Sequence, residues 1–190
     1  MNQPVTILGL CGSLRSGSYT KQAISIVLQH AAEAGAITTL LDADSIRLPL
    51  CDGGEPGPAA AELRQRISAA DALVLATPEY CGTLSAALKN AIEWIGHDRL
   101  QQKVTGLVAV AAGSSADGSL NALRQLALCQ GMWVIPAAAP VPLAERVFEQ
   151  PRDSFSQLVK EHLRALGLAL PEAVRRINQQ AVTVPTGQSA

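Results

Sequence analysis

Short apolar runs alternate along this chain with segments whose apolar residues recur at helical spacing. This alternation restricts the possible folds more than any other feature. Residues 5–10 (VTILGL), 72–77 (ALVLAT) and 105–111 (TGLVAVA) lack the regular polar alternation of a half-exposed strand. Such strands are buried on both faces, which is the situation of a parallel sheet covered by helices on each side. The pattern therefore predicts an α/β fold.

Five strand–helix units follow from this pattern. Strands are expected at residues 5–10, 36–41, 72–77, 105–111 and 133–136, and helices after the first loop and at 59–68, 84–95, 120–129 and 153–166. Five such units match a flavodoxin-like, doubly wound parallel sheet with the strand order 2-1-3-4-5. Residues 1–180 are expected to form a single domain, and residues 181–190 a poorly ordered tail.

Charge and cysteine usage exclude several classes of protein. The 190 residues carry a formal charge of −1, so the basic face expected of a nucleic-acid-binding protein is missing. No stretch reads as a signal peptide or as a transmembrane segment. The four cysteines are irregularly spaced, which disfavours a zinc or iron–sulfur site and favours reduced thiols in a cytoplasmic protein.

The loop after the first strand, residues 11–22 (CGSLRSGSYTKQ), is rich in hydroxyl groups and precedes a helix. Backbone N–H groups at a helix N-terminus favour an anion, and Arg15 could add a charged contact. A nucleoside-triphosphate loop would need lysine at position 18, which is Ser18, and a phosphatase loop would need arginine at 17, which is Gly17. A phosphate site and an ordinary capped turn with a solvated arginine both remain open.

Two further loops follow strands that would lie beside the first strand. They begin after residue 77 (PEYCGT) and after residue 111 (AGSSADG). In the predicted strand order, all three loops meet at the carboxyl ends of neighbouring strands, where doubly wound folds bind their ligands. This convergence favours a ligand site over three unrelated turns.

The sequence of these loops resembles the NADPH-dependent FMN reductase family. The resemblance rests on 12–18 (GSLRSGS), 78–83 (PEYCGT), 88–94 (LKNAIEW) and 48–52 (LPLCD), and it covers about residues 5–136. That family includes quinone, azo-dye and chromate reductases on a flavodoxin-like fold.

The resemblance implies a flavin site built from the three loops. The FMN phosphate would lie at the first loop, the ribityl chain and isoalloxazine at the second, and the pyrimidine side of the ring at the third. These three groups of residues are Ser13, Arg15, Ser18, Tyr19 and Thr20; Pro78, Glu79, Tyr80, Cys81, Gly82 and Thr83; and Gly113, Ser114 and Ser115. Two positions depart from the family, which often has asparagine at position 81 and a second glycine in the third loop.

The resemblance also implies the reaction. NADPH or NADH would reduce the flavin, and a small-molecule electron acceptor such as FMN, a quinone, an azo compound or chromate would be reduced in turn. No side chain is expected to act as a catalytic acid or base, because positioning and backbone N–H groups would suffice. The sequence does not distinguish among the acceptors.

Two other functions remain as alternatives: a flavodoxin-type electron carrier, and a flavin-binding sensor or interaction module. Only 3% of the residues are aromatic, and Tyr80 is the only aromatic residue in the second and third loops, which favours an open flavin face over a carrier. Tyr80 packing against another subunit is the competing interpretation for that residue. The apolar segment 137–143 and the helix at 84–95 suggest a homo-oligomer, and the resemblance implies a homodimer or homotetramer.

Overall fold

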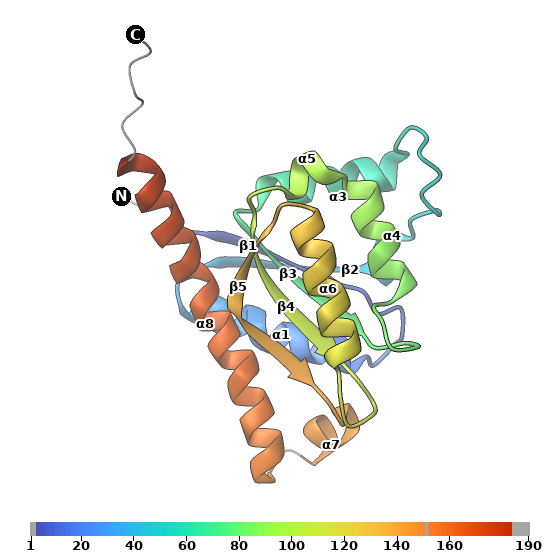
Figure 1. Ribbon diagram of the computed structural model, residues 1–190, viewed down its shortest axis with the longest axis vertical. Helices are drawn as coiled ribbons and strands as arrows, with labels where there is room; N and C mark the ends of the chain where they lie inside the picture. Colours follow the sequence, from blue (N-terminus) through green and yellow to red (C-terminus); the bar gives the residue numbers. More distant parts are fainter. Residues whose placement is uncertain (1–2, 151, 184–190) are drawn as a thin grey trace.

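A computed structural model describes residues 3–150 and 152–183 of the chain and contains one five-stranded sheet (Figure 1). All four strand pairs are parallel, and the strand order is β2-β1-β3-β4-β5. The predicted flavodoxin-like topology is therefore confirmed. The strands are β1 (Thr6–Cys11), β2 (Ile37–Asp42), β3 (Ala72–Pro78), β4 (Val104–Val110) and β5 (Trp133–Val141).

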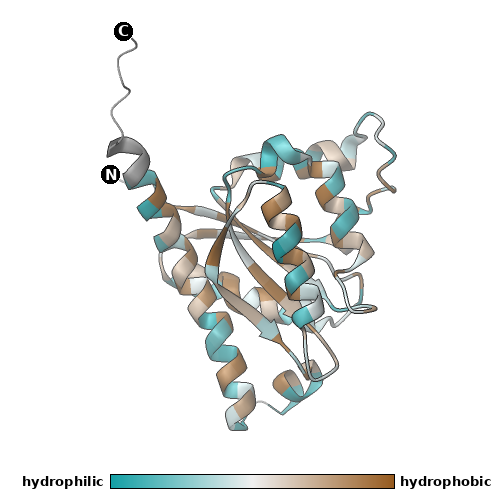
Figure 2. Ribbon diagram, in the orientation of Figure 1, coloured by the Kyte–Doolittle hydropathy of each residue, from teal (hydrophilic) through white to brown (hydrophobic). Residues whose placement is uncertain are grey.

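Helices cover both faces of the sheet and give it two separate hydrophobic cores. One face carries α1 (Tyr19–Glu33), α7 (Ala144–Glu149) and α8 (Ser154–Thr183). The other carries α3 (Pro58–Ala69), α4 (Ala86–Ile95), α5 (His97–Leu100) and α6 (Asp117–Cys129), and the short α2 (Ala43–Ile46) follows β2. Figure 2 shows how the apolar residues gather on the strands and on the inward sides of these helices.

The position of each strand in the sheet explains its composition. Every residue of β3 and β4 is buried, because both strands are central and are covered on both sides. The edge strand β2 instead alternates between exposed and covered residues, and Ile37 on it is 54% exposed.

Strand β5 is longer than the sequence predicts. It runs to Val141 rather than ending at Pro136, and it contains both Pro136 and Pro140. An edge strand tolerates proline because one side of its backbone has no partner, and the β4–β5 register also shifts between Thr105 and Leu107. The prediction treated segment 137–143 as surplus apolar surface. This was wrong, since most of it belongs to β5, with Ala139 and Val141 fully buried.

Helix α8 also extends far beyond the predicted end at residue 166. Gly167 and Pro171 are typical of helix ends, but Leu166, Leu170 and Val174 continue the buried stripe. A Cβ placed on Gly106 of β4 would meet Leu166 Cδ1 at 2.9 Å, so tertiary packing overrides these local signals.

Two further expectations concern helix α8: the side of the helix on which Leu158 lies, and the tail at its end. The apolar spacing within 153–166 predicts Leu158 on the inward side of the helix, whereas its side chain is 56% exposed. The tail expected at 181–190 stays a prediction: residues 181–183 end α8, and 184–190 lie outside the described residues.

Candidate active site

A cavity of about 390 Å³ opens at the carboxyl ends of β1, β3, β4 and β5. Its walls come from the loop before α1, the end of β3 and the following residues, the end of β4, and the start of α7. This is the edge of the sheet where doubly wound folds place their ligands. The lining residues are Ser13, Arg15, Ser16, Gly17, Ser18, Tyr19, Thr20, Pro78, Glu79, Tyr80, Val110, Ala111, Ala112, Ala144 and Glu145.

Eight of the fourteen residues predicted from the sequence lie together in this lining. They are Ser13, Arg15, Ser18, Tyr19, Thr20, Pro78, Glu79 and Tyr80. The other six do not line the cavity, and their contact with a ligand stays a prediction: Cys81, Gly82, Thr83, Gly113, Ser114 and Ser115.

The first loop presents hydrogen-bond donors at the start of α1. Ser18 caps this helix, and its Oγ accepts a hydrogen bond from the backbone N–H of Thr20 at 3.1 Å. Within the described part of the chain, the backbone N–H groups of Ser16, Gly17 and Tyr19 donate no hydrogen bond. The exposed Arg15 side chain likewise makes no ion pair with described residues. These donors lie at the N-terminus of a 15-residue helix, an arrangement that could hold an anion.

The first loop is held against α4 by a close backbone approach. Ser85, the N-cap of α4, donates a hydrogen bond from Oγ to the carbonyl of Gly12 at 2.7 Å. A Cβ on Gly12 would lie 2.6 Å from Leu88 Cβ and 2.8 Å from Ser85 Oγ. Glycine is therefore required at position 12 for the loop to pass over α4.

The second loop is anchored to α6. The carboxylate of Glu79 accepts a hydrogen bond from the Ser119 backbone N–H at 2.9 Å, and Ser119 Oγ donates to the carbonyl of Thr83 at 2.8 Å. Tyr80 and Thr83 pair through two backbone hydrogen bonds, which close a tight turn. Cys81 in this turn has φ 52°, in the left-handed region. The turn is thus fixed at both ends while Tyr80 remains 44% exposed.

The polar groups of the third loop mainly form hydrogen bonds within the loop and to the start of α7. Ser115 Oγ accepts a hydrogen bond from the Asp117 backbone N–H at 3.0 Å and donates to the Asp117 carboxylate at 2.8 Å. Asp117 is the first residue of α6 and not its cap, and Ser115 satisfies its N–H group. Gly113 accepts a hydrogen bond from the Leu143 backbone N–H at 2.8 Å, which ties this loop to the start of α7.

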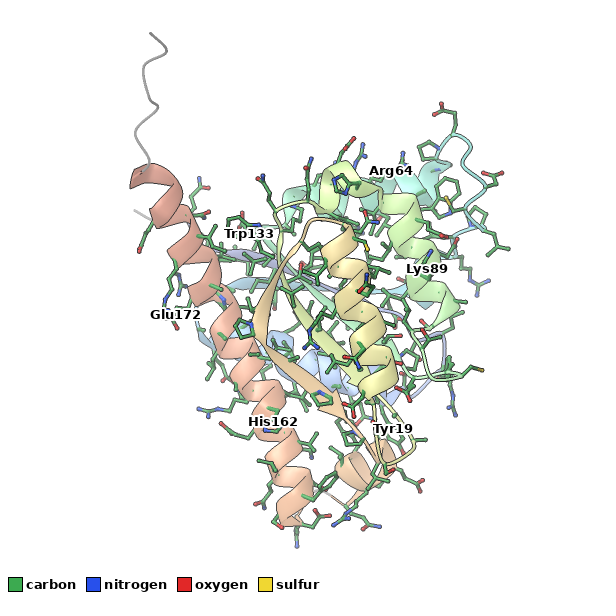
Figure 3. All side chains as sticks on the ribbon, viewed as in Figure 1. Tyr19, Arg64, Lys89, Trp133, His162 and Glu172 are labelled. Carbon is green, nitrogen blue, oxygen red and sulfur yellow. The ribbon has the colours of Figure 1, made fainter. Side chains whose placement is uncertain are left out.

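The end of the cavity formed by α7 could not be inferred from the sequence. Ala144 and Glu145 line it only because β5 continues to Val141 and so carries the chain to this edge. Tyr19 stacks on Phe148 of α7 with ring centroids 5.5 Å apart, and its hydroxyl donates to Glu149 at 3.2 Å. Figure 3 shows Tyr19 at the same end of the molecule as α7.

Two titratable groups near the cavity have altered pKa values. Burial raises the pKa of the Cys11 thiol to about 11, so this thiol is protonated at neutral pH and is a poor nucleophile. The pKa of the Tyr19 phenol is raised by desolvation and then by its hydrogen bond to Glu149. Both groups are therefore neutral under ordinary conditions.

Other residues singled out by the sequence belong to the scaffold. Trp94 is buried, and its Nε1 donates to the carbonyl of Pro49 at 2.7 Å. Asn90 donates to the same carbonyl and accepts from the Cys51 backbone N–H, so α4 holds the segment 49–51 in place. In the portion of the chain that the structure describes, no group of histidine, cysteine and acidic residues could hold a metal, and no helix could cross a membrane.

Comparison with known proteins identifies the family. The sequence model of the NADPH-dependent FMN reductases matches residues 5–145, which include every residue of the cavity. The chain belongs to this family. A flavin-dependent oxidation of NAD(P)H is therefore its class of reaction, and FMN its cofactor.

Relatives and solved structures agree with this membership. An NAD(P)H-dependent FMN reductase of Pseudomonas aeruginosa is 34% identical over 180 residues, covering 88% of this chain and 96% of the relative. An NAD(P)H:quinone oxidoreductase of Solanum tuberosum is 29% identical, covering 88% and 92%. An oxidoreductase structure from Corynebacterium diphtheriae superposes with a TM-score of 0.78 at 19% identity, covering 92% of this chain and 99% of that one, and shares the fold.

Proposed function

We propose that the cavity at the strand ends binds FMN and that this protein uses it to reduce a small-molecule acceptor with NAD(P)H. When bound, FMN supplies the chemistry that accepts hydride from the nicotinamide and delivers reducing equivalents to the acceptor. Relatives named FMN reductase, quinone oxidoreductase and azoreductase support a flavin, a quinone or an azo compound as the acceptor. Chromate is proposed from the family resemblance alone.

The observation that carries the proposal is the set of unused donors at the start of α1. The N–H groups of Ser16, Gly17 and Tyr19 and the Arg15 guanidinium lie in one cavity wall and lack partners among the described residues. A phosphate monoester offers oxygens that accept such hydrogen bonds and a charge that the helix dipole favours. The residues present therefore fit the phosphate end of FMN.

The second and third loops would hold the remainder of the cofactor. We place the isoalloxazine along Pro78, Glu79 and Tyr80, and extend its contacts to Cys81, Gly82 and Thr83. The residues Gly113, Ser114 and Ser115 would approach the pyrimidine side. The hydrogen bonds that fix Glu79 and Thr83 to Ser119 support a rigid wall at this position, which favours precise orientation of bound reactants.

We assign no catalytic acid or base. The Glu79 carboxylate accepts a hydrogen bond from α6, and the Cys11 thiol is buried with a raised pKa. The residues of this chain would then bind the flavin, orient the reactants, and stabilise negative charge on the flavin through backbone N–H groups. A flavodoxin-type carrier is less well supported, because Tyr19 and Tyr80 are the only aromatic residues lining the described cavity.

Binding of FMN and of riboflavin to the Arg15→Met variant tests this site. The two flavins differ only by the phosphate, so loss of the guanidinium should weaken FMN binding about tenfold and leave riboflavin binding unchanged. Flavin fluorescence quenching measures both dissociation constants. Equal effects on the two flavins, or no effect on either, would contradict the placement of the phosphate.

We further propose a cytoplasmic homodimer or homotetramer in which residues 1–180 form the flavin-binding unit. The four cysteines are free thiols, which supports a reducing compartment. Exposed Leu14 and Leu50 line a separate apolar hollow near the first loop, which supports self-association.

A further inference from the structure

Glu145 places a negative charge in the cavity that we assign to a phosphate ester. The lining contains only three charged side chains, Arg15, Glu79 and Glu145. Among these described residues the acids outnumber the cation, which is unexpected for a wall that binds an anion.

The two acids differ in what holds them. Glu79 is fixed by its hydrogen bond from the Ser119 backbone at 2.9 Å. Glu145 is exposed, and in the described structure it forms neither a hydrogen bond nor an ion pair. Its place in the first turn of α7 suits the helix dipole, but no described side chain neutralises its charge by an ion pair.

Glu145 acts on the same region as Arg15, with the opposite sign. Both charges influence the Tyr19 phenol: after desolvation and Glu149, Glu145 also raises its pKa, and Arg15 lowers it. Tyr19 is the first residue of α1 and lines the cavity beside the free donors. A phosphate bound at these donors would consequently be attracted by Arg15 and repelled by Glu145.

We infer that Glu145 sets the affinity for the phosphate-bearing flavin by weakening it, so that FMN exchanges with the solution. The inference rests on the proposed function, which places the phosphate at α1. A phosphate monoester carries about −1.5 to −2 charges near neutral pH, and a nearby carboxylate opposes both its approach and its retention. Glu145 thus favours a protein from which reduced or oxidised FMN is released over one that holds it permanently.

The Glu145→Gln variant tests the inference by equilibrium binding at low ionic strength. We expect its dissociation constant for FMN to fall about three- to tenfold, the range for one charge acting on a partly exposed phosphate. Riboflavin binding should not change, because riboflavin lacks the phosphate. At about 1 M salt, where screening is strong, the gain in FMN affinity should largely disappear.

Asp98→Asn is the matched control, because it removes one exposed acid from α5, at the opposite edge of the sheet. It should change neither FMN nor riboflavin binding. An unchanged FMN affinity in Glu145→Gln, or an equal change for both flavins, would overturn the role of Glu145. If Arg15→Met selectively weakens FMN binding in the same experiment, the proposed phosphate site stands even so. If neither variant distinguishes FMN from riboflavin, the proposed site itself is wrong.

Discussion

Cys81 shows how a single residue in the second loop combines backbone strain with exposure. Its φ of 52° lies in a region that asparagine adopts more readily than most other non-glycine residues. This geometry gives a physical reason for the asparagine that the FMN reductase family often has at this position. The left-handed backbone of Cys81 was not predictable from the sequence, because it depends on the closed turn from Tyr80 to Thr83.

Alkylation of the native thiols distinguishes Cys81 from Cys11. Cys11 is fully buried and its pKa is about 11, so its thiolate fraction near neutral pH is about 100-fold below that of a thiol with the ordinary value of 9.0. Iodoacetamide followed by peptide mass spectrometry should modify the exposed Cys81 and Cys129 long before Cys11.

Adding FMN to the same alkylation reaction tests the second loop. FMN should slow modification of Cys81 several-fold if residues 78–83 border the flavin, whereas Cys129, at the end of α6, should react as before. Equal rates for Cys81 with and without FMN would remove it from the proposed contacts.

The structural elements differed in how well the sequence predicted them. Strand β3 was predicted closely, because an uninterrupted apolar run marks its limits. Helix α1 was expected after the first loop without stated bounds, and it begins at Tyr19, inside the segment 11–22 that was assigned to the loop. Strand β5 and helix α8 were underestimated, since Pro136 and Pro171 read locally as breaks. Tertiary packing decided both cases, and the wall of the cavity formed by α7 was missed as a consequence.

Asp153 stabilises the start of α8, and its contribution depends on pH. Its carboxylate accepts hydrogen bonds from the Ser156 backbone N–H at 2.8 Å and from Arg146 Nε at 3.1 Å. These interactions, the backbone hydrogen bond first, lower the pKa of the carboxyl below its ordinary value of 3.8. Asp153→Ala should therefore lower the melting temperature by about 2–4 °C at neutral pH, and Asp153→Asn, which can still cap the helix, by less.

The sign of the pH effect follows from the direction of that shift. A carboxyl whose pKa is lower in the folded state stabilises the protein above its ordinary pKa. This stabilisation is lost as the pH falls through the lowered value. The difference between wild type and Asp153→Ala, measured by thermal unfolding, should shrink as acid protonates Asp153. A difference that grows in acid would contradict this account.

At the scale of the whole molecule, the strand order and the place of the site were predictable together. Parallel strands ordered 2-1-3-4-5 bring the ends of β1, β3 and β4 to one edge, and the observed cavity lies there. The charge inside the cavity was not predictable in the same way. Arg15 could be assigned to the cavity because it lies in the first loop. Glu145 could not, because it lines the cavity only since β5 continues to Val141.

The central claim is that NAD(P)H reduces FMN held in this cavity, and an anaerobic titration tests it most directly. The FMN-loaded protein is mixed with NADPH or NADH while the visible absorption of the flavin is recorded, with FMN free of protein as the control. We expect the flavin absorption to bleach in proportion to the nicotinamide added and to return when a quinone is introduced. Bound FMN that keeps its full absorption in excess NADPH and NADH would contradict the claim.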